Sequence, residues 1–318
     1  MVIIDVSNPE GANSAQSSSK LPRLPARFRV KSNRYGWFLT LRTTLPLLLS
    51  VICLGQFAPK GLIGSFLILP IIGWSAYRVQ FVLHDTCHMS LFDSRKLNDR
   101  VGTLSGLLVG IYFPRYRTIH FLHHKYNGLI EDPQLPDYLS DENVTSRQYV
   151  KFLFEPLWGM RLIPYLRRDL LEARVVKTDI PQPNFIWFAQ LAAVQSILLM
   201  VLTDFGAKWY YAPFHFFGMA TFSLFLSRLR ALSEHQQIGT NYSDFSRTHP
   251  KNWLDSVLLS DANFCYHLEH HLYPSVQSRH LPDLLRELTS ELHTKDSLGT
   301  TMVKTLVQNF SVLKVKNG

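Results

Sequence analysis

The chain has 318 residues, of which 46% are hydrophobic and only 18% charged, whereas about 25% charged residues is usual in a soluble domain. Its formal net charge is +9, and such a basic balance fits nucleic acid, an anionic membrane face or an acidic protein partner. Three cysteines without a CxxC pair exclude a disulfide framework and a CxxC-type zinc site, and they favour reduced thiols in the cytosol.

The first part of the chain is polar and rich in serine and asparagine (MVIIDVSNPEGANSAQSSSK). It lacks the charged start and the apolar core of a signal peptide. We therefore expect residues 1–30 to form a disordered tail. Residues 31–290 are expected to form one domain, and residues 291–318 a C-terminal cytosolic tail.

Four apolar runs are close to the roughly 20 residues that a helix needs to cross a bilayer: residues 37–57, 61–83, 185–203 and 209–227. Very short loops join the two runs of each pair, which predicts two transmembrane helical hairpins separated by a long polar segment. A soluble protein with buried helices is the alternative. Long buried helices usually carry an amphipathic stripe, however, and these runs are apolar on all sides. We predict an all-α integral membrane protein with four spans.

Basic residues gather before the first run and after the second and fourth, while the hairpin loops carry one lysine each, Lys60 and Lys208. The positive-inside rule then places both termini and the central segment in the cytosol. Since this topology explains most of the basic residues and no nucleic-acid motif accompanies them, we expect no nucleic-acid partner.

Two shorter segments also indicate a membrane. Residues 101–113 are apolar but too short to span, as in a re-entrant or buried interfacial segment. Residues 151–165 alternate aromatic and basic side chains, as in a segment that lies on the membrane surface.

Histidines are concentrated in four segments that this topology brings to the cytosolic face. These are His84 and His88 in HDTCH, His120, His123 and His124 in HFLHH, His235 in SEHQ, and His267, His270 and His271 in HLEHH. The i, i+3, i+4 spacing of the two triple clusters directs three rings to one patch if the segment is helical. This many candidate ligands is more than one ion needs and suits two.

The type of ligand limits the type of metal. Neutral imidazole suits Zn, Cu, Fe and Ni, whereas a structural zinc site closes with four ligands that usually include thiolates. Asp85, Glu234 and Glu269 interleave with the histidines and are expected to accept imidazole N–H bonds that fix the rings. The remaining histidines are expected to be ordinary core or surface residues: His215, His249, His280 and His293.

In order and spacing, HDTCH, HFLHH and HLEHH resemble the HxxxH, HxxHH and HxxHH boxes of the membrane fatty-acid desaturase and hydroxylase superfamily. The context NFCYHLEHHLYPSV is similar to the third box of acyl-lipid desaturases. The resemblance covers most of the chain, from about residue 37 to the region of His280. It implies that residues 31–290 form a desaturase domain with a cytosolic helical cap, and that the nine histidines hold two non-haem irons. Some members carry an asparagine where this chain has Ala231, so the resemblance implies a water or no ligand there.

The resemblance also implies an activity. This is O2-dependent desaturation of an acyl lipid or acyl thioester, with electrons from a separate donor such as ferredoxin or cytochrome b5. An apolar tunnel is expected to present the chain, with Tyr112, Trp158 and Tyr266 as candidates near its mouth. A hydroxylase or ketolase acting on fatty acids, sphingolipids or carotenoids stays open, because it would use the same boxes. A non-catalytic metal transporter or sensor is a further alternative, although its ligands would lie inside the spans, where only His215 lies.

Overall fold

The computed structural model describes residues 23–57, 62–129, 131–137, 145–159, 180–205, 211–235, 246–288 and 300–316. The start of the predicted N-terminal tail, both hairpin loops and His293 lie outside these ranges. The protein is helical, as predicted. Apart from an isolated bridge between Thr248 and Tyr266, the described residues contain no β structure.

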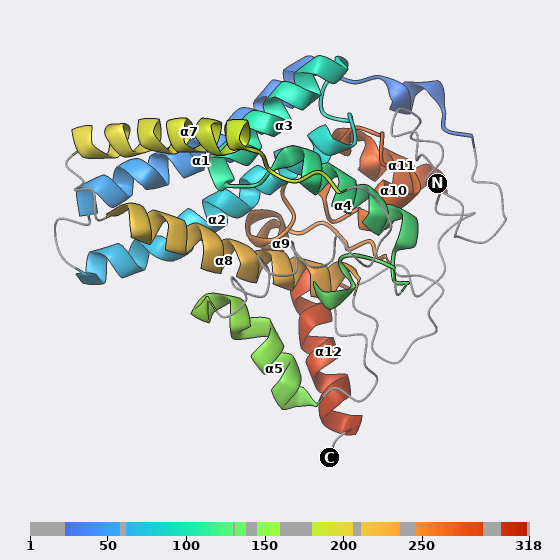
Figure 1. Cartoon of the computed structure of the whole chain (residues 1–318). Coiled ribbons are helices and arrows are strands. Elements are labelled where there is room, and N and C mark those ends of the chain that lie inside the picture. Colours follow the sequence, from blue (N-terminus) through green and yellow to red (C-terminus); the bar gives the residue numbers. More distant parts are fainter. Residues whose placement is uncertain are drawn as a thin grey trace.

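Four long helices run side by side on one side of the molecule (Figure 1): α1 (Asn33–Phe57), α2 (Leu62–Cys87), α7 (Phe185–Asp204) and α8 (Tyr211–Glu234). Helix α2 is central, because it packs against α1, α8 and α3 (Arg95–Val109). Its contact with α1 is apolar and includes Leu47, Leu54 and Ile72. Its contact with α8 also has a polar part, in which Gln80 donates to Ser223 Oγ at 2.8 Å.

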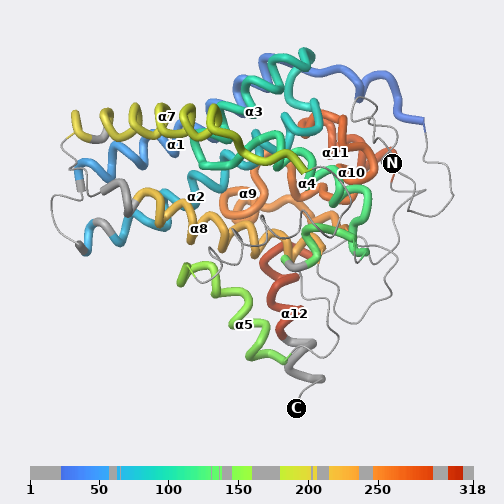
Figure 2. Tube along the Cα trace, in the orientation of Figure 1, coloured from blue at the N-terminus to red at the C-terminus, as the bar shows by residue number. Residues whose placement is uncertain are grey.

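The remaining elements lie around one end of these helices. They are the helices α4 (Phe113–Tyr126), α5 (Ser146–Phe154), α9 (Trp253–Leu258), α10 (His267–Leu272), α11 (Leu281–Leu288) and α12 (Met302–Lys316), and the 3-10 turns η2 (Ala26–Arg29), η4 (Leu135–Asp137), η5 (Glu155–Trp158), η7 (Asp261–Asn263) and η8 (Ser278–His280). Figure 2 traces residues 246–288, in orange to red, as they fold against the ends of α2 and α4. Helices α5 and α12 pack on each other and on α8.

Among the described residues, two helices are long and apolar enough to cross a membrane, Asn33–Gln56 and Phe66–Cys87. In α7 the apolar stretch is shorter, Phe185–Val201. Helix α8 is long, but it carries Arg228, Arg230 and Glu234 near its C-terminus. Two of the four predicted spans are therefore matched by helices of this length and composition, and the other two stay a prediction.

Packed structure extends beyond both predicted domain boundaries. The turn η2 begins at Ala26, and Phe28 is buried among side chains of α11, so order begins before the predicted boundary at residue 31. Helix α12 lies in the predicted C-terminal tail and packs against α8. Each of these two segments packs against residues that are far away in the sequence. Composition alone does not reveal such contacts.

The apolar run at residues 101–113 is divided between two helices. Helix α3 begins at the N-cap Ser94, whose Oγ accepts from Leu97 N, and ends at Gly110 in the left-handed conformation (φ 73°). Helix α4 starts at Phe113 with Pro114 in its first turn, where proline is well tolerated. This sharp turn sets the position of the second histidine cluster relative to α2.

Candidate metal centre

The first pair of histidines occupies the end of α2. His84 lies in its last turn and His88 follows directly, so i, i+4 spacing places both rings on one side. The chain then turns at Met89 in the left-handed conformation (φ 55°), while Ser90 N donates to Asp85 O at 2.9 Å. This turn ends the helix and leaves both imidazoles buried.

The two triple clusters are each carried by a helix, as their spacing predicts. Helix α4 carries His120, His123 and His124, and α10 is a short helix made of the cluster HLEHH and one leucine. All residues of α10 are buried. Because α10 is so short, its position depends on the segments that flank it.

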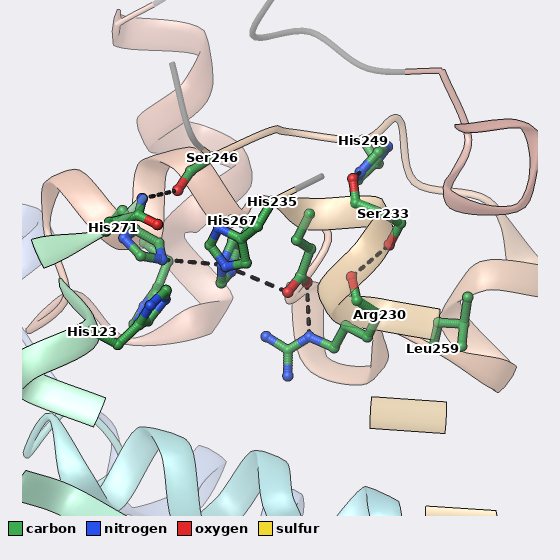
Figure 3. Close-up of polar contacts among 12 residues, drawn as sticks. His123, Arg230, Ser233, His235, Ser246, His249, Leu259, His267 and His271 are labelled. Atoms are coloured by element: carbon green, nitrogen blue, oxygen red, sulfur yellow. Dashed lines mark hydrogen bonds and ion pairs between the residues drawn. The ribbon is translucent and has the colours of Figure 1, made fainter. Parts of the chain in front are cut away.

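One of these segments joins the end of α8 to the start of α10. Arg247 N donates to Glu234 O at 3.0 Å, and His249 N donates to Cys265 O at 2.8 Å. The His249 ring lies between two carbonyls. Its Nε2 is 3.1 Å from Ser233 O (Figure 3), and its Nδ1 is 2.6 Å from Thr300 O. These bonds hold His235, just past α8, beside His267.

The nine predicted histidines meet in two groups. The first contains five residues, His84, His88, His120, His124 and His270, and the second contains four, His123, His235, His267 and His271. Within each group, the candidate ligand nitrogens all lie within 4.8 Å of one another. Eight of the nine side chains are buried and His124 is half-buried. Helices α4 and α10 contribute to both groups, so the two groups are neighbours.

Ring nitrogens face ring nitrogens in both groups. In the first, His124 Nε2 is 3.1 Å from His120 Nε2 and 3.2 Å from His270 Nε2. In the second, His267 Nε2 is 2.7 Å from His235 Nε2 and 3.0 Å from His271 Nε2. Nε2 of His84 and of His88 has no hydrogen-bond partner among the described residues. Since buried polar atoms need partners, converging lone pairs of this kind fit a bound cation.

The protonation state of the rings agrees with metal binding. Burial, followed by the fields of His124 and His88, lowers the pKa of His120 well below its ordinary value of 6.5. Burial, followed by His124 and His123, has the same effect on the pKa of His271. Burial therefore favours the neutral form of His120 and His271, which is the form of imidazole that binds metal ions.

Carboxylates orient two of the rings from outside. Asp132 Oδ2 lies 3.0 Å from His123 Nδ1, and its Oδ1 lies at 3.1 Å. Asp85 lies 3.4 Å from His84 Nδ1 and also accepts from Ser278 Oγ at 2.9 Å. A carboxylate at Nδ1 fixes the tautomer that turns the Nε2 lone pair toward the centre of the group. Asp132 was not predicted from the sequence.

The other two predicted carboxylates are placed differently. Glu234 Oε2 lies 3.5 Å from Nε2 of His267, the nitrogen that faces His235 and His271, and its Oε1 accepts from Arg230 Nε at 2.7 Å (Figure 3). Glu269 accepts a 2.5 Å hydrogen bond from Thr248 Oγ1. Arg230 and Thr248 are thus further residues of the site that the sequence did not indicate.

Aromatic rings close the site on the side of α2. The Arg230 guanidinium lies over the ring of Phe264 at 4.9 Å and that of Phe81 at 5.3 Å. Phe264 in turn lies 4.6 Å from the His84 ring. Phe264, which packs against Phe81, therefore covers the His84 ring on the side of α2.

The three predicted tunnel residues do not form one cluster in the described structure. Tyr112 is half-buried with its ring 5.5 Å from that of Trp187, while Trp158 is 77% exposed on η5. Tyr266 is half-buried and packs near α11. Of the histidines outside the clusters, His249 and His280 hydrogen-bond to backbone carbonyls and His215 is buried in α8.

The family model for fatty acid desaturases matches residues 59–298, which include all nine histidines. The chain therefore belongs to the fatty acid desaturase family, which lies within the desaturase and hydroxylase superfamily of oxidoreductases. No curated protein matches the chain.

Proposed function

We propose that the protein is a membrane-bound di-iron desaturase of acyl chains. The observation that carries the proposal is the pair of converging histidine groups, five rings in one and four in the other. Imidazole suits iron, and the described site has no set of thiolates that would favour structural zinc. When bound, two irons would supply the reduction of O2 and the removal of hydrogen from an unactivated C–H bond.

The reaction balances with an external donor. A saturated –CH2–CH2– unit loses two hydrogens and becomes –CH=CH–, while O2 takes up these hydrogens together with two electrons and two protons to give two waters. The chain's own residues would orient the rings: Asp132 and Asp85 hold His123 and His84 by Nδ1, and Phe264 packs against the His84 ring.

The proposal includes a membrane and partners. Two helical hairpins, α1–α2 and α7–α8, would cross the bilayer with both termini in the cytosol. Large apolar side chains exposed on the long helices support this, among them Leu67 at 71% and Phe185 at 86%. The substrate would be an acyl lipid or an acyl thioester, with Tyr112, Trp158 and Tyr266 near the entrance of its tunnel. A basic cytosolic face would suit an acidic electron donor such as a ferredoxin or a cytochrome b5.

The test is to express the protein in a host and to compare the fatty acids and lipids by mass spectrometry. A desaturase produces a species lighter by two hydrogens, and purified protein should hold about two irons per chain. The variants His124→Ala and His271→Ala are expected to insert in membranes and to lose the product, whereas His280→Ala, outside both groups, is expected to keep it. A species heavier by one oxygen would assign a hydroxylase, and metal binding with no modified lipid would favour a transporter or sensor.

A further inference from the structure

A pocket on the flank of α1 lies outside the histidine site. It measures about 220 Å³ and lies between α1 and the segment that runs from α9 through η7. Its α1 wall contains Tyr35, Phe38, Leu39 and Arg42, and its other wall contains Lys251, Ser256, Ser260, Asp261, Ala262 and Asn263. None of the nine histidines lines it.

Positive charge is in excess at this pocket. Asp261 is buried and pairs with Arg42, at 2.9 Å, and with Arg78 from α2. Lys251 stands on the opposite wall, where its Nζ donates to Asn263 Oδ1 at 2.8 Å. Two cations, Arg42 and Lys251, therefore line the pocket against one carboxylate, Asp261, which is also paired with Arg78. The Arg42 side chain is 49% exposed, so its guanidinium is open to a second anion.

Hydrogen-bond donors lie among these charges. The Ser256 hydroxyl lines the pocket and has no hydrogen-bond partner among the described residues. Asn263 has a left-handed backbone (φ 66°), and its amide nitrogen donates to Ser278 O while its amide oxygen accepts from Lys251. Guanidinium, ammonium and hydroxyl groups on facing walls are the groups that recognise a phosphate.

Apolar surface continues from both walls of the pocket. Along α1, Phe38 begins a stripe with Leu41, Leu45 and Leu48, which are all exposed at helical spacing. On the other wall, α9 exposes Trp253, Leu254, Val257 and Leu258. Trp74 in α2 donates to Val257 O at 2.7 Å, which fixes α9 against a helix apolar enough to cross a membrane. A ligand with a phosphate head and acyl tails matches this arrangement.

We propose that this pocket binds the phosphate head of an anionic membrane phospholipid, whose acyl chains lie along the exposed faces of α1 and α9. Net positive charge selects an anionic lipid over a zwitterionic one, because phosphatidylcholine brings its own cation. The inference rests on the proposed membrane placement, but it does not depend on the reaction. It assigns a bound lipid to the outside of the helical bundle, separate from the histidine groups.

Native mass spectrometry of the metal-loaded, detergent-solubilised protein tests this site without any turnover. Dioleoyl phosphatidylglycerol is titrated against dioleoyl phosphatidylcholine, and we expect one phosphatidylglycerol to bind more tightly. Since a cation near a membrane contributes on the order of a fivefold change in binding, Lys251→Ala and Arg42→Gln should each weaken that lipid about fivefold. Lys251 is exposed, so its replacement leaves the core intact.

Lys304→Ala is the matched control, since Lys304 lies on α12, which projects from the α8 side of the molecule (Figure 1). It removes the same charge and should leave the lipid affinity unchanged. Equal binding of the two lipids, or equal loss in the Lys304 variant, would refute the site. The last measurement adds inorganic phosphate at millimolar concentration as a competitor. If phosphate displaces the lipid completely, the pocket binds free phosphate and the lipid assignment is wrong.

Discussion

Asp132 lies nine residues after His123, in the turn that follows α4, and it is 2% exposed. Besides the histidine, it accepts from Gln134 N at 2.8 Å and Gly128 N at 3.2 Å. The loop therefore fixes the carboxylate, and the carboxylate fixes the ring. A single acidic residue thus determines which nitrogen of His123 is available inside the second histidine group.

The variant Asp132→Asn keeps the size of this side chain and one acceptor oxygen but removes its charge. Loss of a carboxylate that orients a metal-bound histidine typically costs 10- to 100-fold in metal affinity. We expect a loss of this size in competition with a calibrated chelator. Glu131→Gln, an exposed neighbour, is the control and should bind as the original protein does. Unchanged affinity in the Asp132 variant would show that the ring is held by its packing alone.

Sequence spacing predicted which histidines would gather, because i, i+3 and i+4 positions share a helix face whatever the rest of the fold does. Their role as ligands stays a prediction. Asp132, Arg230 and Thr248 could not be foreseen in the same way. Each reaches the site through a turn or through an element that packs from elsewhere, and no local spacing encodes such contacts.

Helix α8 differs from its predicted apolar run, residues 209–227, because it continues through two arginines to Glu234. Both arginines find partners within the fold. Arg228 lies 3.7 Å from the Phe152 ring centre and 3.3 Å from Asp137, and Arg230 pairs with Glu234. By hydropathy, the two arginines predict the end of a membrane helix. Their contacts with Phe152, Asp137 and Glu234 instead allow α8 to continue, so that His235 reaches the site.

The contact between α2 and α8 depends on two glycines. A Cβ at Gly73 would collide with Phe222 and would lie 2.7 Å from Gly218 O. At Gly218, the nearest atoms to a Cβ would be 3.2–3.3 Å away. Small residues allow helices to approach closely in membranes, where burial of apolar surface cannot drive their association.

Gly73→Ala is therefore expected to push α2 and α8 apart and to destabilise the protein by about 1–3 kcal/mol, the usual cost of overpacking. Thermal unfolding in detergent measures the effect. Gly218→Ala serves as the comparison and should cost less, because its neighbours need to move by only a few tenths of an ångström. If the Gly73→Ala variant were as stable as the Gly218→Ala variant, the contact between α2 and α8 would adapt to the added methyl group without cost.

At the scale of the molecule, the prediction of an all-helical protein is confirmed by the described residues, while the arrangement as two membrane hairpins with a cytosolic cap stays a prediction. The order of the segments in space did not follow from the sequence. Helix α9, for example, packs beside α2 through Trp74 although more than 180 residues separate the bonded partners. Long-range contacts of this kind decide where the four histidine segments meet.

These four segments come from α2, α4, the end of α8 and α10, so metal ions bound by the two groups would tie α4 and α10 to the packed pair of α2 and α8. Ligands that bind only the folded state add stability by mass action, about 4 kcal/mol when free metal exceeds its dissociation constant a thousandfold. Removing the metal with a chelator should therefore lower the thermal midpoint. It should also increase amide exchange in α4 and α10 more than in the contact between α1 and α2.

Zinc separates this structural role from the reaction. Because Zn²⁺ also binds imidazole but has no redox chemistry, refilling the stripped protein with zinc should restore the thermal midpoint and the amide protection without restoring any desaturation. Refilling with iron should restore the thermal midpoint, the amide protection and the desaturation. If neither metal raised the midpoint, the nine rings would be held by the apolar packing around them, and their convergence would have to be explained without a metal ion.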